Sequence, residues 1–146
     1  MNHARELAPS ALAALDRLRA RGIPLLAQTV LLRGVNDTPE ALEALFRALI
    51  RARVKPHYLH VLDPAPGTAR FRVPLDRARA LHAGLRGRLP GHAIPSLVLD
   101  IPGGFGKVEA NAPRLMPSPG GGFVAIDPQG APHALPLGVA AAPESR

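Results

Sequence analysis

The spacing of apolar residues along the chain predicts three amphipathic helices. In the first, residues 9–21, leucines and alanines fall on one face, Pro9 suits the first helical position and Gly22 suits the residue after the last turn. A second helix follows Asp37, which we expect to be its N-cap, and a third spans about residues 74–89. Each of these helices has an apolar face that must pack against another element.

Three strongly apolar stretches between the helices predict strands at residues 23–32, 54–62 and 94–99. The first stretch is almost continuously apolar, as is typical of a parallel strand buried on both faces. Strands that alternate with helices imply right-handed crossovers and a parallel α/β sheet or barrel segment. Three strands do not close a barrel and leave two sheet edges, so the pattern favours part of a larger α/β unit.

Proline and glycine are concentrated in the last third of the chain, which we expect to be rich in loops. Residues 122–126 and 132–137 flank an Asp-Pro-Gln-Gly turn and predict a small β-hairpin. We therefore expect three parts: a partial (βα) barrel segment over residues 1–107, a loop and hairpin extension over 108–138, and a disordered tail over 139–146.

The formal net charge of this 146-residue chain is +7, and it comes almost entirely from arginine. Such a charge is compatible with a non-catalytic basic fragment that binds nucleic acid or an acidic partner. However, the arginines alternate with apolar residues, and aromatic residues, which stack on bases, make up only 3% of the chain. A solvated, arginine-rich helix face is the better interpretation, and we expect no nucleic-acid partner.

Cysteine is absent from the sequence. This excludes disulfides, a Cys-ligated zinc site and an iron–sulfur cluster within this chain, and we expect no metal ligands in it. No apolar run approaches the ~20 residues of a membrane span, and the charged start of the chain is unlike a signal peptide. We expect a cytoplasmic protein that does not contact a membrane.

Two acidic residues stand where predicted strands end, Asp63 and Asp100. In α/β barrels the active site gathers at the carboxyl ends of the strands, so these two side chains could converge and bind a cation such as a substrate ammonium. The alternative is that each one caps a turn, because Asp before Pro is common in loops.

Lys107 ends a glycine-rich segment, DIPGGFGK, at residues 100–107. Glycines let the backbone pass close to a ligand, and a lysine beside apolar walls could contact a phosphate or form a Schiff base. The segment is not a Walker phosphate loop, because Val108 stands where Ser or Thr is needed. A flexible loop that ends in a solvated lysine is the alternative.

Three runs in these segments resemble, in order and spacing, the lysine 2,3-aminomutase family. They are LLAQTVLLRGVND (25–37), HYLHVLDPAPGTARFRV (57–73) and VLDIPGGFGK (98–107). NHARE (2–6) is similar to the family's Asn-His-Pro-x-Glu motif, to whose residues we assign no role. The resemblance covers about residues 2–137 and implies the C-terminal part of a partial, TIM-like (βα) barrel.

The resemblance also implies an activity and a set of site residues. Family members interconvert L-lysine and β-lysine with pyridoxal phosphate and a radical derived from S-adenosylmethionine. By this resemblance Lys107 would hold pyridoxal phosphate, Asp63 and Asp100 would bind the ε-ammonium of L-lysine, and Gln28 would lie near the cofactor phosphate. Tyr58 would lie near the cofactor or the substrate, or else in the core.

The chain also departs from the family pattern. The family binds its 4Fe–4S cluster through Cys-x-x-x-Cys-x-x-Cys, upstream of the matching region, and Ala4 and Ala27 replace the usual Pro and Asn. We expect a truncated gene product or a mis-called start codon, with an inactive isolated chain that forms a homo-oligomer or associates with the missing N-terminal half. The alternative enzyme, which makes β-lysine for elongation factor P, usually lacks the acidic residue at position 100. Asp63 and Asp100 together favour the enzyme that acts on free lysine.

Overall fold

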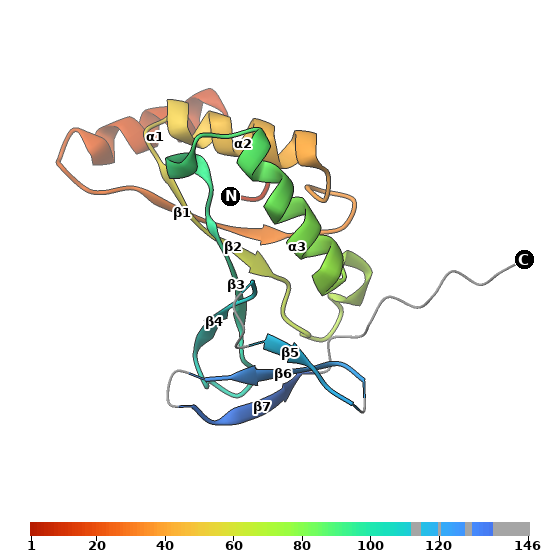
Figure 1. Cartoon of the computed structure of the whole chain (residues 1–146). Coiled ribbons are helices and arrows are strands. Elements are labelled where there is room, and N and C mark those ends of the chain that lie inside the picture. Colours follow the sequence, from red (N-terminus) through yellow and green to blue (C-terminus); the bar gives the residue numbers. More distant parts are fainter. Residues whose placement is uncertain (112–114, 120, 128–129, 136–146) are drawn as a thin grey trace, which may run out of the picture.

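The computed structural model describes residues 1–111, 115–119, 121–127 and 130–135 (Figure 1). Its helices are α1 (Pro9–Arg19), α2 (Pro39–Arg51) and α3 (Leu75–Gly84), with short 3₁₀ turns η1 (Ala4–Glu6), η2 (Ala69–Phe71), η3 (Leu85–Gly87) and η4 (Gly91–Ala93). Its strands are β1 (Leu26–Leu31), β2 (Lys55–Val61), β3 (Ser96–Asp100), β4 (Lys107–Glu109), β5 (Leu115–Pro117), β6 (Phe123–Ile126) and β7 (Pro132–Leu135).

The first sheet has the strand order β1-β2-β3-β4. Strands β1, β2 and β3 are parallel, and β4 returns antiparallel to β3. Helices α1, α2 and α3 lie on one side of this sheet (Figure 1). The predicted α-β-α-β-α-β order and the parallel pairing are therefore confirmed, whereas closure into a TIM-like barrel is not. The short strand β4 was not predicted.

The core lies between the parallel strands and α2. Side chains of α2 and of the three parallel strands in this layer are at most 1% exposed: Leu31, Leu42, Leu45, Phe46, Leu49, Leu59 and Leu97. The predicted inward residues of the third helical segment, Ala78, Leu81, Leu85 and Leu89, are buried too. Packing of α2 and α3 on one sheet face buries these apolar side chains, whereas α1 has no buried residue and leaves Leu12 and Leu18 of its apolar face exposed, contrary to the prediction.

The prediction that the first strand is buried on both faces is wrong. Along β1 exposed and buried residues alternate, so that Leu26 is 57% exposed whereas Ala27 and Leu31 are buried. Side chains of a strand point alternately to its two faces, and the helices cover only one face of this sheet. The other face therefore presents Gln28 and its neighbours on β2 to the surroundings.

The N-cap of α2 is Thr38, not Asp37 as predicted. Thr38 Oγ1 accepts a hydrogen bond from the Ala41 amide at 3.2 Å, while Asp37 Oδ1 accepts from the Gly34 amide at 2.8 Å. The two residues stand side by side and both can accept from a free amide, so the sequence pattern does not separate them. Asp37 closes the preceding turn instead.

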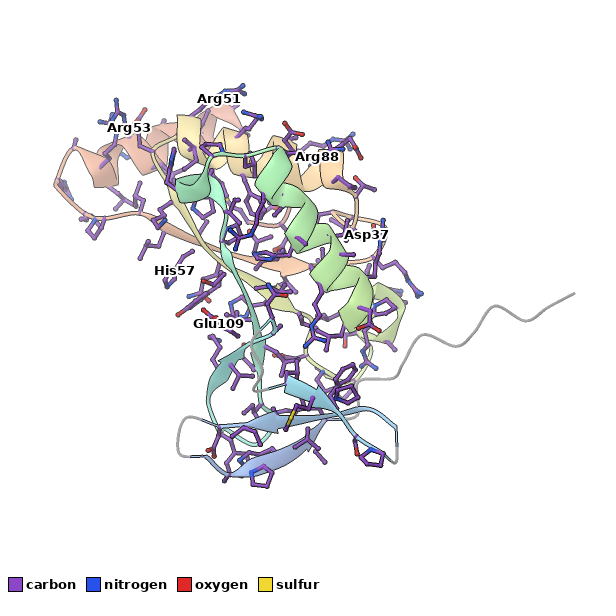
Figure 2. All side chains as sticks on the ribbon, in the orientation of Figure 1. Asp37, Arg51, Arg53, His57, Arg88 and Glu109 are labelled. Atoms are coloured by element: carbon purple, nitrogen blue, oxygen red, sulfur yellow. The ribbon has the colours of Figure 1, made fainter. Side chains whose placement is uncertain are left out.

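Arg88 connects the end of the α3 segment to α2. Its guanidinium forms ion pairs at 3.1 Å with Glu40 and with Glu43, both on α2 (Figure 2). Hydrogen bonds from Arg47 and, next, from Arg88 lower the pKa of the Glu43 carboxylate below its ordinary value. Because these are surface pairs, the network fixes the position of α3 more than it adds to stability.

The first residues of the chain cover the free edge of β1. Asn2 Oδ1 accepts from the Val30 amide at 2.8 Å, and the buried Asn36 amide donates to the carbonyl oxygens of Asn2 and Val30 at 2.8 and 2.9 Å. His3 and Glu6 form a capping box around η1. The Asn-His motif thus has a structural role here, which the sequence analysis left open.

The second sheet has the antiparallel order β5-β6-β7. The predicted hairpin is confirmed as the β6–β7 pair, while β5 was not predicted. Residues 136–137 of the hairpin and the expected tail at 139–146 lie outside the described residues. The domain boundaries stay a prediction, although the one after residue 107 falls inside β4. Within the described part of the chain, no helix has the length and apolar character needed to cross a membrane.

Candidate functional site

Lys107 and Asp100 face each other across two antiparallel strands. The pairing of β3 with β4 places Asp100 opposite Lys107, and the lysine Nζ donates a hydrogen bond to Asp100 Oδ1. The glycine-rich loop between them is closed by a 2.9 Å hydrogen bond from the Ile101 amide to the Gly106 carbonyl. Lys107 is therefore held by a strand rather than carried on a flexible loop, which was the alternative.

A chain of hydrogen bonds extends from Asp100 across the open face of the sheet. His60 Nδ1 lies 3.0 Å from Asp100 Oδ2, and His60 Nε2 lies 3.0 Å from Gln28 Oε1. Since an ionised carboxylate only accepts, His60 donates its Nδ1 hydrogen to Asp100. One side chain from each strand takes part, so that β1, β2, β3 and β4 together build the row Gln28–His60–Asp100–Lys107.

His60 was not identified from the sequence. A signal was available, because residues two apart in a strand share a face, and Tyr58 and His60 both occupy the open face of β2. Their rings meet edge to face with centroids 5.7 Å apart, and the Lys107 ammonium lies 5.7 Å from the Tyr58 ring centroid. Tyr58 thus stands beside the lysine and outside the core, so the second of its two predicted places is wrong, and its position near a cofactor or substrate stays a prediction.

Asp63 and Asp100 both line one pocket of about 480 Å³. Its wall is completed by backbone and small side chains, namely Pro64, Ala65, Ile101, Pro102, Gly104 and Gly106. Asp63 is exposed, and within the described part of the chain its carboxylate makes no hydrogen bond. Its backbone carbonyl accepts from Ala65 and Thr68. The two residues thus line the same pocket, and turn capping does not explain the Asp63 side chain, while binding of an ammonium by this pair stays a prediction.

The environment of Asp100 keeps its carboxylate ionised. Burial by itself would raise the pKa of this group, but the hydrogen bonds from Lys107 and His60 outweigh burial and hold the pKa below its ordinary value of 3.8. An acid with two hydrogen-bond donors and a lowered pKa is suited to bind a cation and unsuited to act as a general acid near neutral pH.

This lowered pKa predicts an acid-dependent contribution to stability. The pKa of Asp100 is lower in the folded than in the unfolded chain, so its contribution is fully present above about pH 3.8 and is lost as the pH falls through the folded value. Because the side chain is 38% exposed, we expect at most about 1 kcal/mol. Urea unfolding of the wild-type chain and of Asp100→Asn should differ at pH 7 and converge below pH 3.8. A difference that stays constant with pH would contradict this assignment.

The glycine-rich loop is tied to the second sheet through Phe105. The Phe105 ring stacks on the His133 ring of β7 with centroids 4.1 Å apart, and His133 Nε2 lies 2.9 Å from Asp127 Oδ2. Gly103 has φ +93°, and a Cβ there would approach the Phe105 ring to 2.7 Å. The loop needs glycine at this position because the aromatic ring folds back over it.

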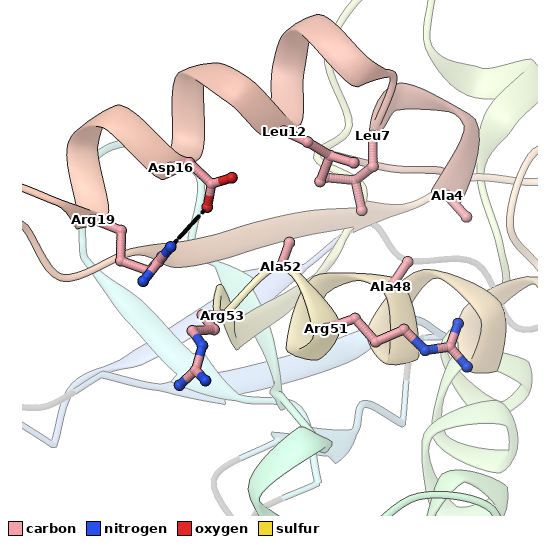
Figure 3. A pocket seen from close by; sticks show the side chains of 9 residues that line it. All are labelled: Ala4, Leu7, Leu12, Asp16, Arg19, Ala48, Arg51, Ala52 and Arg53. Carbon is pink, nitrogen blue, oxygen red and sulfur yellow. Dashed lines mark hydrogen bonds and ion pairs between the residues drawn. The ribbon is translucent and has the colours of Figure 1, made fainter.

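A second pocket, of about 420 Å³, lies between α1 and α2 (Figure 3). Leu7, Leu12 and Arg19 line it from the side of α1, and Arg51 and Arg53 line it from the end of α2 and the residues after it. Asp16 is paired with Arg19 at 3.1 Å. The residues that line it include no Ser, Cys, Lys or His, so this pocket offers no nucleophile for covalent chemistry.

The row of polar side chains suits a carbonyl cofactor better than a metal. Lys107 offers a partly exposed primary amine, and the backbone of Gly104 and Gly106 lines the adjoining pocket, where it can approach an anionic group. These residues fit pyridoxal phosphate. Among the described residues no group of three or more His, Cys, Asp or Glu side chains could hold a metal ion. Without cysteine, the donor set does not fit an iron–sulfur cluster.

The chain is similar to several curated aminomutases. It is 50% identical over 107 residues to a protein of Aquifex aeolicus provisionally named L-lysine 2,3-aminomutase, a match that covers 73% of this chain. It is 42% identical over 106 residues to the L-lysine 2,3-aminomutase of Fusobacterium nucleatum, and 43% identical over 103 residues to that of Escherichia coli. This chain belongs to the lysine 2,3-aminomutase family. The matches cover only 29%, 25% and 30% of these three relatives. No family model matches the chain.

Proposed function

We propose that this lysine 2,3-aminomutase homologue holds pyridoxal phosphate and the substrate L-lysine for the interconversion of L-lysine and β-lysine. One observation carries the proposal: Lys107 and Asp100 are paired at the ends of adjacent strands, next to a pocket that Asp63 shares. An amine for the cofactor and two acids for a remote ammonium thus lie at the same end of the sheet. The names of the relatives support the same reaction.

Each side chain in the row has a distinct task in this proposal. Lys107 attaches the cofactor, and Gln28 contributes an amide toward the cofactor phosphate. Asp63 and Asp100 bind the ε-ammonium of the substrate through charge-assisted hydrogen bonds, which fixes the distant reacting carbons in place. When bound, pyridoxal phosphate would supply an aldehyde and a conjugated ring that hold the amino nitrogen while it migrates between neighbouring carbons.

Generating the radical that starts such a migration requires an iron–sulfur cluster and S-adenosylmethionine in addition to these residues. This chain has no cysteine to bind a 4Fe–4S cluster, so we propose that the cluster and S-adenosylmethionine belong to a cluster-binding part with which these residues must associate. We also propose that the parallel strands form part of a TIM-like (βα) barrel in the complete enzyme. The isolated 146-residue chain is expected to have no aminomutase activity.

Covalent trapping of the cofactor tests the proposal directly. We expect incubation with pyridoxal phosphate, reduction with borohydride and peptide mapping to label Lys107 in preference to Lys55. These are the two lysines of the chain, so each serves as the internal reference for the other. Lys55 lies on the surface and donates to the His92 carbonyl at 3.2 Å, without an acid beside it. Equal labelling of both lysines, or labelling of Lys55 alone, would reject Lys107 as the cofactor lysine.

A further inference from the structure

The Asp100 carboxylate, proposed to bind the substrate ammonium, is already paired with the ammonium of Lys107. Asp100 Oδ1 accepts from the Lys107 ammonium, and Oδ2 accepts from His60. The Lys107 side chain is 30% exposed and that of Asp100 is 38% exposed, so solvent weakens this pair only in part. A primary ammonium on a flexible four-carbon stem is also the chemical group that the side chain of free lysine presents.

We infer that Lys107 masks Asp100 in the chain without cofactor, so that the pocket takes an ammonium-bearing ligand well only after Lys107 has lost its positive charge. The inference rests on the proposed function, in which the same lysine attaches the cofactor. If Lys107 attached a cofactor aldehyde, its ammonium would first give up a proton and the amine would then form a carbon–nitrogen double bond while the aldehyde oxygen left as water, so that no free lysine ammonium would remain beside Asp100. The covalent step thus releases the carboxylate at the moment when a cationic substrate is needed.

The charge count of the pocket supports this order of events. Asp63 and Asp100 bring two negative charges to the pocket, and the Lys107 ammonium offsets one of them. A second ammonium at Asp100 Oδ1 would lie within contact distance of the first, where like charges repel most strongly. Neutral Lys107 removes this repulsion and leaves both acids to the ligand. Cofactor attachment and binding of a cationic ligand are therefore coupled positively, and each strengthens the other.

His60 makes the masking effective by restricting how Asp100 can turn. Its Nδ1 holds Oδ2 at 3.0 Å, and its Nε2 is held in turn by Gln28 at 3.0 Å. His60 is a strand residue whose side chain is only 12% exposed. Asp100 consequently has one carboxylate oxygen, the one that faces Lys107, with which it can bind the ammonium of a ligand. We therefore assign His60 as a positioning residue that lets one carboxylate serve the lysine and the ligand in turn.

The binding of n-butylammonium to the chain without cofactor tests the masking. This probe carries an ammonium and no carboxylate or aldehyde, and its affinity can be measured by NMR titration of backbone amides in residues 101–106. We expect Lys107→Met to bind the probe about tenfold more tightly than the wild-type chain, or about 1.4 kcal/mol. Lys107→Arg keeps the cation and should bind the probe as weakly as the wild type. Adding Asp100→Asn to Lys107→Met should remove the gain.

The matched control is Lys55→Met, which lowers the net charge equally but lies on the surface away from the carboxylates. It should leave the affinity unchanged. Lys107→Gln repeats the test with a polar neutral residue, so that neither an apolar contact nor misfolding of one variant decides the result. Unchanged affinity in both neutral variants overturns the masking, even if trapping shows that Lys107 attaches the cofactor. A higher affinity for n-butylammonium in both neutral variants upholds the masking of Asp100 even if trapping labels Lys55. The masking and the cofactor role of Lys107 can therefore be rejected independently of each other.

Discussion

Replacing Lys107 by arginine is expected to abolish covalent trapping of pyridoxal phosphate. Arginine keeps a positive charge beside Asp100, so the ion pair and the local fold are preserved, but its guanidinium is not deprotonated in proteins and forms no Schiff base. We expect borohydride-dependent labelling to fall at least about hundredfold, a difference near 2.7 kcal/mol in the attachment equilibrium. Mass spectrometry of the reduced protein gives the labelled fraction directly.

The matched variant is Lys55→Arg, which changes the other lysine in the same way. It should retain wild-type labelling, because the partner of the Lys55 ammonium among the described residues is a backbone carbonyl, that of His92. Circular dichroism of both variants should coincide with that of the wild type. Wild-type labelling in Lys107→Arg, together with its loss in Lys55→Arg, would refute the proposed role of the site.

Replacing Phe46 by alanine is expected to lower the free energy of unfolding by about 3–5 kcal/mol. Phe46 is fully buried in α2, within the apolar cluster that also contains Leu31 and Leu59. Removing the ring loses its transfer free energy and leaves a cavity that the surrounding side chains fill only in part. Since domains of this size are stable by about 5–15 kcal/mol, the loss is a large share of the total. Urea unfolding at pH 7 measures it.

Two further variants separate the cavity from a general effect on α2. Phe46→Leu keeps part of the apolar volume and should cost clearly less than Phe46→Ala. Arg51→Ala changes an exposed residue near the end of the same helix and should stay within about 0.5 kcal/mol of the wild type. A loss below 1 kcal/mol for Phe46→Ala would show that α2 does not form the core described above.

The regular part of the fold was predictable because its signal repeats along the chain. The α2 segment has Leu42, Leu45, Phe46 and Leu49 at helical spacing, and burial of all four follows from that spacing alone. The burial of β1 was not predictable in the same way. A continuous apolar run fits a strand covered on both faces as well as one covered on a single face. Only the position of the helices decides between them.

The site was predictable only in part, because local sequence patterns do not show which residues of different strands come into contact. Asp63 and Asp100 were identified from their places at strand ends, and Lys107 from the glycines before it. The strand β4 has three residues, too few to show a periodic pattern, so the cross-strand contact of Lys107 with Asp100 was not foreseen. His60 and Asn36 were missed for a related reason. Their partners lie 40 residues away for His60, and up to 34 away for Asn36.

Phe105 and His133 have a consequence for how the chain can be shortened or extended. The ring contact connects Phe105, in the loop that precedes Lys107, to His133, a strand residue 28 positions further along the sequence. A shorter version that ends at residue 111 would keep every side chain of the polar row, yet its loop would lose the aromatic support of β7. The hairpin is therefore not a removable appendage. We therefore expect substitutions or deletions in β7 to change the position of the loop before Lys107 and, with it, the environment of the Lys107 amine.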